Sequence, residues 1–252
     1  MKNLLFVILL FATFTTQAAI TIISDLDDTI KITEASGDPG DLLGEKIYTG
    51  MPEFYQGSKG YSKTLYVLSA SPSLLRSKVE GILRKNKISY QGLLLRSNIF
   101  ENKFDYKVRA IKRLIDSSSD DFILIGDDVG DDPEVYAEIN RLYPGRILDS
   151  YVHVVRARRI PKGIISYWTS FDLTLREFES SRMKESWVKK VFKKLLGERD
   201  LEYVFPREAH CPSVATVWQW QTRTIFSREA GALVDRFNSF CQVRQSANYL
   251  IQ

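Results

Sequence analysis

The sequence is poor in cysteine and histidine and carries little net charge. It has two cysteines, two histidines and a formal charge of +4 over 252 residues. This small total gives no indication of nucleic-acid binding, so we expect no nucleic-acid partner. No internal repeat or low-complexity tract is present. His153 lies in a strand-like run and His210 lies beside Cys211, and we expect neither histidine to act in catalysis or to bind a metal.

The N-terminal apolar run is too short to span a membrane. Residues 4–14 form this run after Lys2, and residues 16–19 (Thr-Gln-Ala-Ala) offer small side chains for cleavage. The pattern predicts a secretory signal peptide over residues 1–19. A spanning helix needs roughly 20 apolar residues, so we expect no transmembrane segment in the mature protein. An uncleaved N-terminal anchor is the alternative.

Export would place the protein in the periplasm or outside the cell. Such compartments are oxidising. Cys211 and Cys241 are then expected to form a disulfide, and two separate buried thiols are the alternative.

From residue 20 onward, runs typical of buried strands alternate with amphipathic helical patterns. The strand-like runs are residues 20–24, 64–68, 92–96, 122–125 and 149–155. Helical spacing is found at residues 104–115, at residues 134–142, and in the series Leu74, Leu75, Val79, Ile82 and Leu83. The alternation predicts an α/β fold with a Rossmann-like parallel sheet over residues 20–164. The segment between the first two strands is too short for an independent cap domain, so any cap is minimal.

The pattern changes after about residue 161. Residues 173–196 predict a long charged helix or a helix pair, and a further helix is expected around residues 228–240. We assign residues 165–252 to a small, α-rich C-terminal appendage. The apolar face of its first helical segment is expected to dock on the protein itself. Contact of this basic amphipathic segment with an anionic membrane surface is the alternative.

Acidic residues follow two of the predicted strands. Asp25 and Asp27 come directly after the first strand, and Asp127 and Asp132 follow the fourth. Ligands in open α/β sheets bind beyond the carboxyl ends of the strands, so these acids are expected at one site. Neighbouring carboxylates repel unless a cation or a shared proton relieves the repulsion. A strand that ends in an acidic turn without chemistry is the alternative.

Together with Ser69 and Lys107, these acids provide what phosphoryl transfer requires. One carboxylate attacks phosphorus, and a second protonates the leaving alcohol and then activates water. A further acid completes an oxygen-rich site for Mg²⁺. Lys107 and the Ser69 hydroxyl hold the phosphoryl oxygens. Lys103 or Lys112 is the alternative to Lys107 in this role.

These motifs resemble those of the haloacid dehalogenase-like phosphatases. Residues 25–29 (Asp-Leu-Asp-Asp-Thr) match the DxDxT motif of that superfamily. Ser69 matches its second motif, Lys107 its third, and Gly126-Asp127 with Asp132 its fourth. An acid at position 27, two residues after the nucleophile, indicates a phosphatase or phosphotransferase rather than a dehalogenase.

Over roughly residues 20–160, the sequence also resembles the actin-patch-protein type of Mg²⁺-dependent phosphatidate phosphatase. The resemblance rests on residues 24–31, 69–72, 92–96, 122–127, 132–136 and 143–146. It does not reach the C-terminal third. Two positions depart from the family pattern: Asp128 stands where Ser is common, and Ser97 where Asp is common. Both departures could shift the choice of substrate.

The resemblance implies a role for each acid. Asp25 is the nucleophile and Asp27 the general acid and base. Asp25, Asp127 and the backbone carbonyl of Asp27 hold Mg²⁺. Asp132 binds the metal through water or orients Lys107, and Asp131 competes with Asp132 for that role.

Other basic residues are weaker candidates. Lys31 and Arg96 either meet an anionic group of the substrate or are surface charges at strand ends. The basic run at residues 156–162 is either a solvated face or a surface that attracts anionic lipids.

The expected activity is Mg²⁺-dependent hydrolysis of a phosphomonoester through an aspartyl-phosphate. The resemblance makes phosphatidate at a membrane surface the first substrate to test. An exported phosphatase of soluble phosphomonoesters is the nearer alternative. A non-catalytic interaction protein on a phosphatase scaffold is the more distant one.

Overall fold

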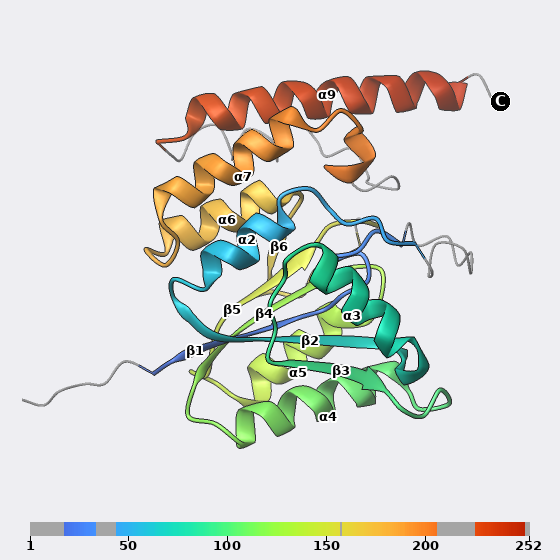
Figure 1. Cartoon of the computed structure of the whole chain (residues 1–252), viewed down its shortest axis with the longest axis vertical. Helices are drawn as coiled ribbons and strands as arrows, with labels where there is room; N and C mark the ends of the chain where they lie inside the picture. The colour runs from blue at the N-terminus through green and yellow to red at the C-terminus, as the bar shows by residue number, and fades with distance from the viewer. Residues whose placement is uncertain (1–17, 34–43, 157, 206–224, 250–252) are drawn as a thin grey trace, which may run out of the picture.

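A six-stranded, entirely parallel β-sheet forms the centre of the computed structural model (Figure 1). The structure describes residues 18–33, 44–156, 158–205 and 225–249. The strands are β1 (Ile20–Ser24), β2 (Ser62–Pro72), β3 (Gly92–Arg96), β4 (Asp121–Asp127), β5 (Ile147–His153) and β6 (Ile165–Tyr167). Their order in the sheet is β3-β2-β1-β4-β5-β6. The predicted α/β fold with a Rossmann-like parallel sheet is therefore confirmed.

The central strands are buried on both faces, which explains their continuous apolar sequences. All five residues of β1 are buried. Successive side chains point to opposite faces, so Ile22 joins one apolar core and Ile23 joins the other. Because β1 lies between β2 and β4, its last residue is aligned with Val67 on one side and with Ile125 on the other.

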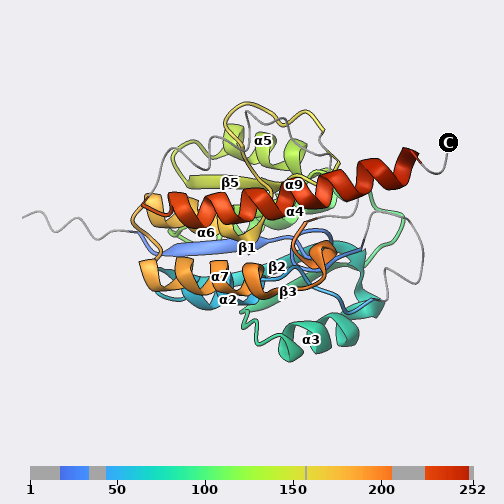
Figure 2. The same ribbon diagram turned by 90° about the horizontal axis from the view of Figure 1, so that it is seen from above.

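Helices cover both faces of the sheet (Figures 1 and 2). One face is covered by α4 (Lys103–Asp116) and α5 (Asp132–Leu142). The other is covered by α2 (Met51–Ser58), α3 (Arg76–Lys85), α6 (Ser170–Glu179) and α7 (Glu185–Gly197). The long helix α9 (Ser227–Tyr249) packs on α7 at the outside. Two 3₁₀ turns complete the described elements: η1 (Ser73–Leu75) and η2 (Leu201–Tyr203).

The C-terminal part is rich in helix, and its helices pack on the sheet domain. The expected segment at residues 173–196 is a helix pair, α6 and α7, separated by a turn in which Ser181 has a φ of 60°. Val188, Val191 and Leu195 of α7 are fully buried in the same core as β1 and α2. The apolar face of α7 therefore docks on the protein itself, as expected. The strand β6, which the sequence did not predict, extends the sheet past residue 164.

Several predictions fall partly outside the described residues. The predicted signal peptide includes residues 1–17, which are not described. Cys241 is buried on α9 and is disulfide-bonded. Its predicted partner, Cys211, lies outside the described part of the chain. None of the helices in the described segments has the length and apolarity needed to cross a bilayer.

Asp172 gives α6 a pH-dependent contribution to stability. Its Oδ2 accepts hydrogen bonds from the backbone N–H groups of Trp168 and Thr169, both at 2.8 Å. Within the described residues, its buried Oδ1 has no hydrogen-bond partner. Burial raises the pKa of Asp172 to about 7, even though the two N–H groups act in the opposite direction. The folded carboxyl thus keeps a proton at pH values where the unfolded one, with a pKa of about 3.9, has lost it.

The free energy of unfolding should therefore fall as the pH rises from about 4 to 7. We expect the Asp172→Asn variant to reduce the slope of the free energy of unfolding against pH by up to about 1.4 kcal/mol per pH unit. Urea denaturation at pH 5 and pH 8 measures the change. Asp105→Asn is the matched control, because Asp105 occupies the same position in the first turn of α4 but is exposed. If the free energy of unfolding changed equally with pH in wild type and in Asp172→Asn, Asp172 would not be the group responsible for the pH dependence.

Candidate active site

The site begins in the tight turn that follows β1. The backbone N–H of Asp25 donates to the carbonyl of Ile125 at 2.7 Å, which holds the end of β1 against β4. Asp28 has a φ of 53°, in the left-handed region, and its carboxylate accepts the backbone N–H of Thr33 at 3.0 Å. This turn places Asp25 and Asp27 in the wall of one cavity. The carboxylate of Asp28 is occupied by the turn itself.

Lys107 joins two buried acids. It lies on α4, and its Nζ donates to Asp25 Oδ1 at 2.7 Å and to Asp132 Oδ1. Within the described residues, the second oxygen of Asp25, Oδ2, accepts no hydrogen bond. Asp132 is at the start of α5, and its Oδ2 accepts the backbone N–H of Asp127 at 3.3 Å. Both oxygens of Asp132 are therefore engaged in orienting other groups.

Asp127, the last residue of β4, completes an acidic cluster. One of its oxygens accepts the backbone N–H groups of Val129 and Gly130, at 2.7 and 3.2 Å. The carboxylate oxygens of Asp25, Asp127 and Asp132 lie within 4.8 Å of one another, and all three residues are buried. Asp131 is less buried and is not part of this cluster.

The electrostatics of the cluster favour a bound cation. Burial raises the pKa of Asp25 well above its ordinary value; Lys107 opposes this rise, whereas Asp132 and Asp127 add to it. Burial and the neighbouring Asp132 raise the pKa of Asp127 to about 8. Burial also works against the charge of Lys107, but Asp132 and Asp25 hold its pKa above the ordinary value. One lysine thus balances three buried carboxylates incompletely, and oxygen ligands of this kind suit Mg²⁺.

Asp27 is the most exposed of the site acids and is held by hydroxyl groups. Its Oδ2 accepts hydrogen bonds from Ser69 Oγ at 3.0 Å and from Ser71 Oγ at 2.9 Å. Its Oδ1 lies 3.4 Å from Lys31 Nζ. The side chain keeps 25% of its surface exposed, so it faces the cavity. Ser71 was not singled out from the sequence, although it lies in the same Ser-Ala-Ser-Pro turn as Ser69.

These residues surround a cavity of about 440 Å³ at the carboxyl ends of β1, β2, β3 and β4. Five of the six site residues predicted from the sequence line it: Asp25, Asp27, Ser69, Lys107 and Asp127. Asp132 lies directly behind them and is fully buried. Arg96 and Lys103 also line the cavity and add two basic side chains to its wall. Lys112 instead donates to the hydroxyl of Tyr143, so the structure brings Lys107, not Lys112, to the acids.

The two positions that depart from the family pattern lie outside the cavity wall. Asp128 is fully buried and accepts the backbone N–H groups of Val155, Arg156 and Arg158. It therefore fixes the start of the basic run at residues 156–162. Ser97 is exposed on the loop after β3. Nothing in this geometry gives either residue a contact with a ligand in the cavity.

His153 makes structural contacts. It is buried at the end of β5, and its Nδ1 lies 2.7 Å from the carbonyl oxygen of Asp28. Its ring stacks on Tyr167, with centroids 4.9 Å apart. Burial lowers the pKa of His153. His153 thus connects the acidic turn after β1 to Tyr167 of β6, the strand at the edge of the sheet.

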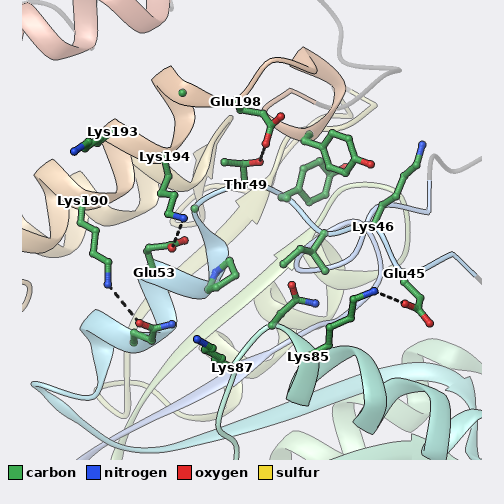
Figure 3. A pocket seen from close by; sticks show the side chains of 18 residues that line it. Glu45, Lys46, Thr49, Glu53, Lys85, Lys87, Lys190, Lys193, Lys194 and Glu198 are labelled. Atoms are coloured by element: carbon green, nitrogen blue, oxygen red, sulfur yellow. Dashed lines mark hydrogen bonds and ion pairs between the residues drawn. The ribbon is translucent and has the colours of Figure 1, made fainter.

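A larger hollow of about 1210 Å³ lies between α2, α7 and the end of α3 (Figure 3). It is lined by six lysines and three glutamates, among other residues. Two of the lysines are paired with acids: Lys85 with Glu45 at 2.7 Å and Lys194 with Glu53 at 3.6 Å. The hollow contains no member of the acidic cluster. The chemistry therefore belongs to the smaller cavity.

A comparison with known protein families agrees with this placement. A family model described as "Phosphatidate phosphatase APP1, catalytic domain" matches residues 20–154, which contain the whole acidic site. Curated proteins give no significant match. Among solved structures, a phosphoserine phosphatase from T. onnurineus in complex with NDSB-201 is 14% identical, with a TM-score of 0.40. The alignment covers 62% of this chain and 92% of that chain. This structural likeness is too weak to carry an argument.

Proposed function

The chain belongs to the family of phosphatidate phosphatase APP1 catalytic domains and is a phosphatase, and from this premise we propose that it hydrolyses phosphomonoesters through an aspartyl-phosphate. The observation that carries the proposal is the buried contact of Lys107 with Asp25, next to Asp127 and Asp132. A fold alone does not need like charges held together at a cavity wall. Phosphoryl transfer does need them, because it depends on positioning and charge neutralisation.

Asp25 is the proposed nucleophile. Its Oδ1 is held by Lys107, which leaves Oδ2 to form a bond with phosphorus as the ester P–O bond breaks. Asp27, in its protonated form, gives its proton to the leaving alcohol. It then takes a proton from a water molecule, whose oxygen attacks phosphorus. The bond between phosphorus and Asp25 breaks, and inorganic phosphate and the original carboxylate are released.

The remaining residues hold and balance charge. Ser69 and Ser71 orient Asp27, and Asp132 orients Lys107. Asp25, Asp127 and the backbone carbonyl of Asp27 would hold Mg²⁺, and the ion would supply positive charge to neutralise the phosphoryl oxygens. The buried oxygen donors and the raised pKa values of Asp25 and Asp127 fit such an ion.

Phosphatidate is the substrate that the family membership favours. The cavity is open to solvent. Besides Asp25, Asp27 and Asp127, the acidic residues of its described lining are Asp131 and Asp28, and the Asp28 carboxylate accepts hydrogen bonds from Thr33. We further propose that the protein is exported, because the N-terminal sequence has the pattern of a signal peptide.

A substrate panel tests the proposed function. The mature protein is assayed with p-nitrophenyl phosphate, soluble sugar and nucleotide phosphates, and dispersed phosphatidate, each in Mg²⁺ and in excess chelator. We expect Mg²⁺-dependent turnover, with phosphatidate preferred. Turnover of soluble esters alone would overturn the lipid assignment, and no Mg²⁺-dependent turnover would overturn the enzyme assignment.

Arg96 is expected to bind the phosphate group. It is 9% exposed and lines the cavity; within the described residues it forms no ion pair, and its Nε has no hydrogen-bond partner. A hydrogen bond to a charged group contributes about 1.5–3 kcal/mol. Arg96→Gln should therefore raise the inhibition constant of inorganic phosphate by roughly tenfold or more. Arg84→Gln, at an exposed position on α3, is the control. An unchanged inhibition constant for Arg96→Gln would show that Arg96 is only structural.

A further inference from the structure

Three exposed apolar side chains lie on chain segments that begin at the catalytic cavity. Leu74 is 78% exposed, Ile99 is 52% exposed and Phe100 is 90% exposed. They are three of seven large apolar side chains that are exposed in the described segments, and all three follow β2 or β3. The sequence pattern had grouped Leu74 with the buried face of a helix. In the structure α3 begins only at Arg76, and Leu74 lies in η1 and points away from the core.

Both segments start at the cavity wall. Pro72 and Arg96 are aligned in the sheet, and both line the cavity. Leu74 comes two residues after Pro72. Ile99 and Phe100 lie on the loop from Arg96 to Lys103, and both ends of that loop line the cavity. The loop extends beyond the carboxyl end of the sheet (Figure 1). We call Leu74, Ile99 and Phe100 the apolar rim.

Hydrogen bonds hold the exposed loop in place. Asn98 Oδ1 accepts the backbone N–H of Phe100 at 3.0 Å, and the Asn98 carbonyl accepts the backbone N–H of Glu101 at 3.2 Å. Arg96 donates to the carbonyl of Glu101 at 2.6 Å. The side chain of Glu101 is paired with Arg109 of α4. Phe100, the most exposed large apolar side chain of the described residues, thus lies on a loop that hydrogen bonds hold in place. One of these bonds comes from Arg96 of the cavity wall.

We propose that the apolar rim docks on the surface of a phospholipid bilayer and inserts its side chains among the lipid chains. The inference rests on the proposed function. Because both segments that carry the rim begin at the cavity wall, a surface that docks on the rim lies next to the cavity, and an occupant that itself carries the substrate fits both. A bilayer presents apolar chains for the rim and, a short distance above them, a phosphate group for the cavity. Lys103 is exposed at the mouth and has no carboxylate partner within the described residues, which favours an anionic surface.

A vesicle-binding assay tests the docking of the rim independently of catalysis. Full mature protein is co-sedimented with phosphatidylcholine vesicles, with and without phosphatidate, and is assayed on the same vesicles and on p-nitrophenyl phosphate. The Leu74→Ser/Phe100→Ser double variant should lose vesicle binding and vesicle turnover by about tenfold or more. Its kcat/KM for p-nitrophenyl phosphate should stay at the wild-type value. Ile225→Ser is the matched control, because Ile225 is 72% exposed and does not line the cavity; it should behave as wild type.

Wild-type binding and turnover by the double variant would overturn the inference, and so would an equal loss in Ile225→Ser. A dimeric wild type that becomes monomeric in the double variant, with vesicle binding unchanged, would show that the rim contacts a second copy instead. The Asp25→Asn protein should still bind vesicles through the rim. If wild type hydrolyses p-nitrophenyl phosphate but does not sediment with vesicles, the rim inference fails alone. If wild type hydrolyses no phosphate ester, the proposed function fails, and the binding assay still decides the role of the rim.

Discussion

The Asp25→Asn variant is expected to lose phosphatase activity by a factor of about 10⁴ or more. An amide cannot attack phosphorus to form the covalent intermediate. The structure places Asp25 at the cavity wall with Lys107 on one oxygen and leaves the other oxygen for attack. The measurement is kcat for p-nitrophenyl phosphate in saturating Mg²⁺. Asp105→Asn, at an exposed position on α4, should keep full activity. Activity of Asp25→Asn within tenfold of wild type would mean that another group is the nucleophile.

The same substitution is expected to stabilise the metal-free protein. Burial holds the pKa of Asp25 well above its ordinary value and contributes to a pKa of about 8 for Asp127. The folded state therefore binds protons that the unfolded state has lost, and stability falls as the pH rises from about 4 to 8. Lys107 keeps Asp132 as its buried partner, so removing the Asp25 carboxylate should raise the free energy of unfolding at pH 8 in chelator by about 1 kcal/mol or more. Mg²⁺ should then stabilise wild type more than Asp25→Asn. Urea denaturation with and without Mg²⁺ measures both effects, and a less stable variant in chelator would contradict them.

The position of the acidic site was predictable because parallel strands fix it. Asp25 and Asp127 each follow a buried run, and adjacent parallel strands must bring their carboxyl ends together. The arrangement depends on no side-chain detail, so the spacing of the motifs was sufficient to predict where the acids lie. The position of Asp132 was predictable for the same reason, because Asp132 is the first residue of the helix that comes directly after β4.

Features that depend on where an element begins could not be read from the sequence. Leu74 fits the apolar spacing of the following helix, yet the chain takes a 3₁₀ turn first, and the residue is exposed. The strand β6 has only three residues, too few for a periodic pattern to identify it, and pairing with β5 is what makes them a strand. For Arg96 the sequence left two interpretations open, contact with an anionic group or a surface charge, and only the structure shows that the residue is buried at the cavity wall.

Lys107→Gln is expected to have the largest effect on stability. Lys107 Nζ contacts Asp25 and Asp132, and all three side chains are nearly inaccessible to solvent. Breaking a buried ion pair by removing one partner destabilises a protein by about 3–5 kcal/mol, because the other charge stays buried without compensation. We expect a loss of this size in the free energy of unfolding, measured by urea denaturation at pH 8 in chelator. Activity should also fall by a factor of about 10² or more, since the charge that faces the phosphoryl group is lost.

The pH dependence of the destabilisation in Lys107→Gln distinguishes the loss of a positive charge from a packing defect. Lys107 keeps its charge across the accessible pH range, because neighbouring acids hold its pKa above the ordinary value. Asp127, with a pKa of about 8, takes up a proton as the pH falls. Fewer carboxylates then need the cation, so the destabilisation of Lys107→Gln relative to wild type should shrink between pH 8 and pH 5. Lys112→Gln is the control on the same helix, because Lys112 contacts the Tyr143 hydroxyl and no site acid. A loss that is equal at both pH values, or that is larger for Lys112→Gln, would contradict the role of Lys107 as the cation of the site.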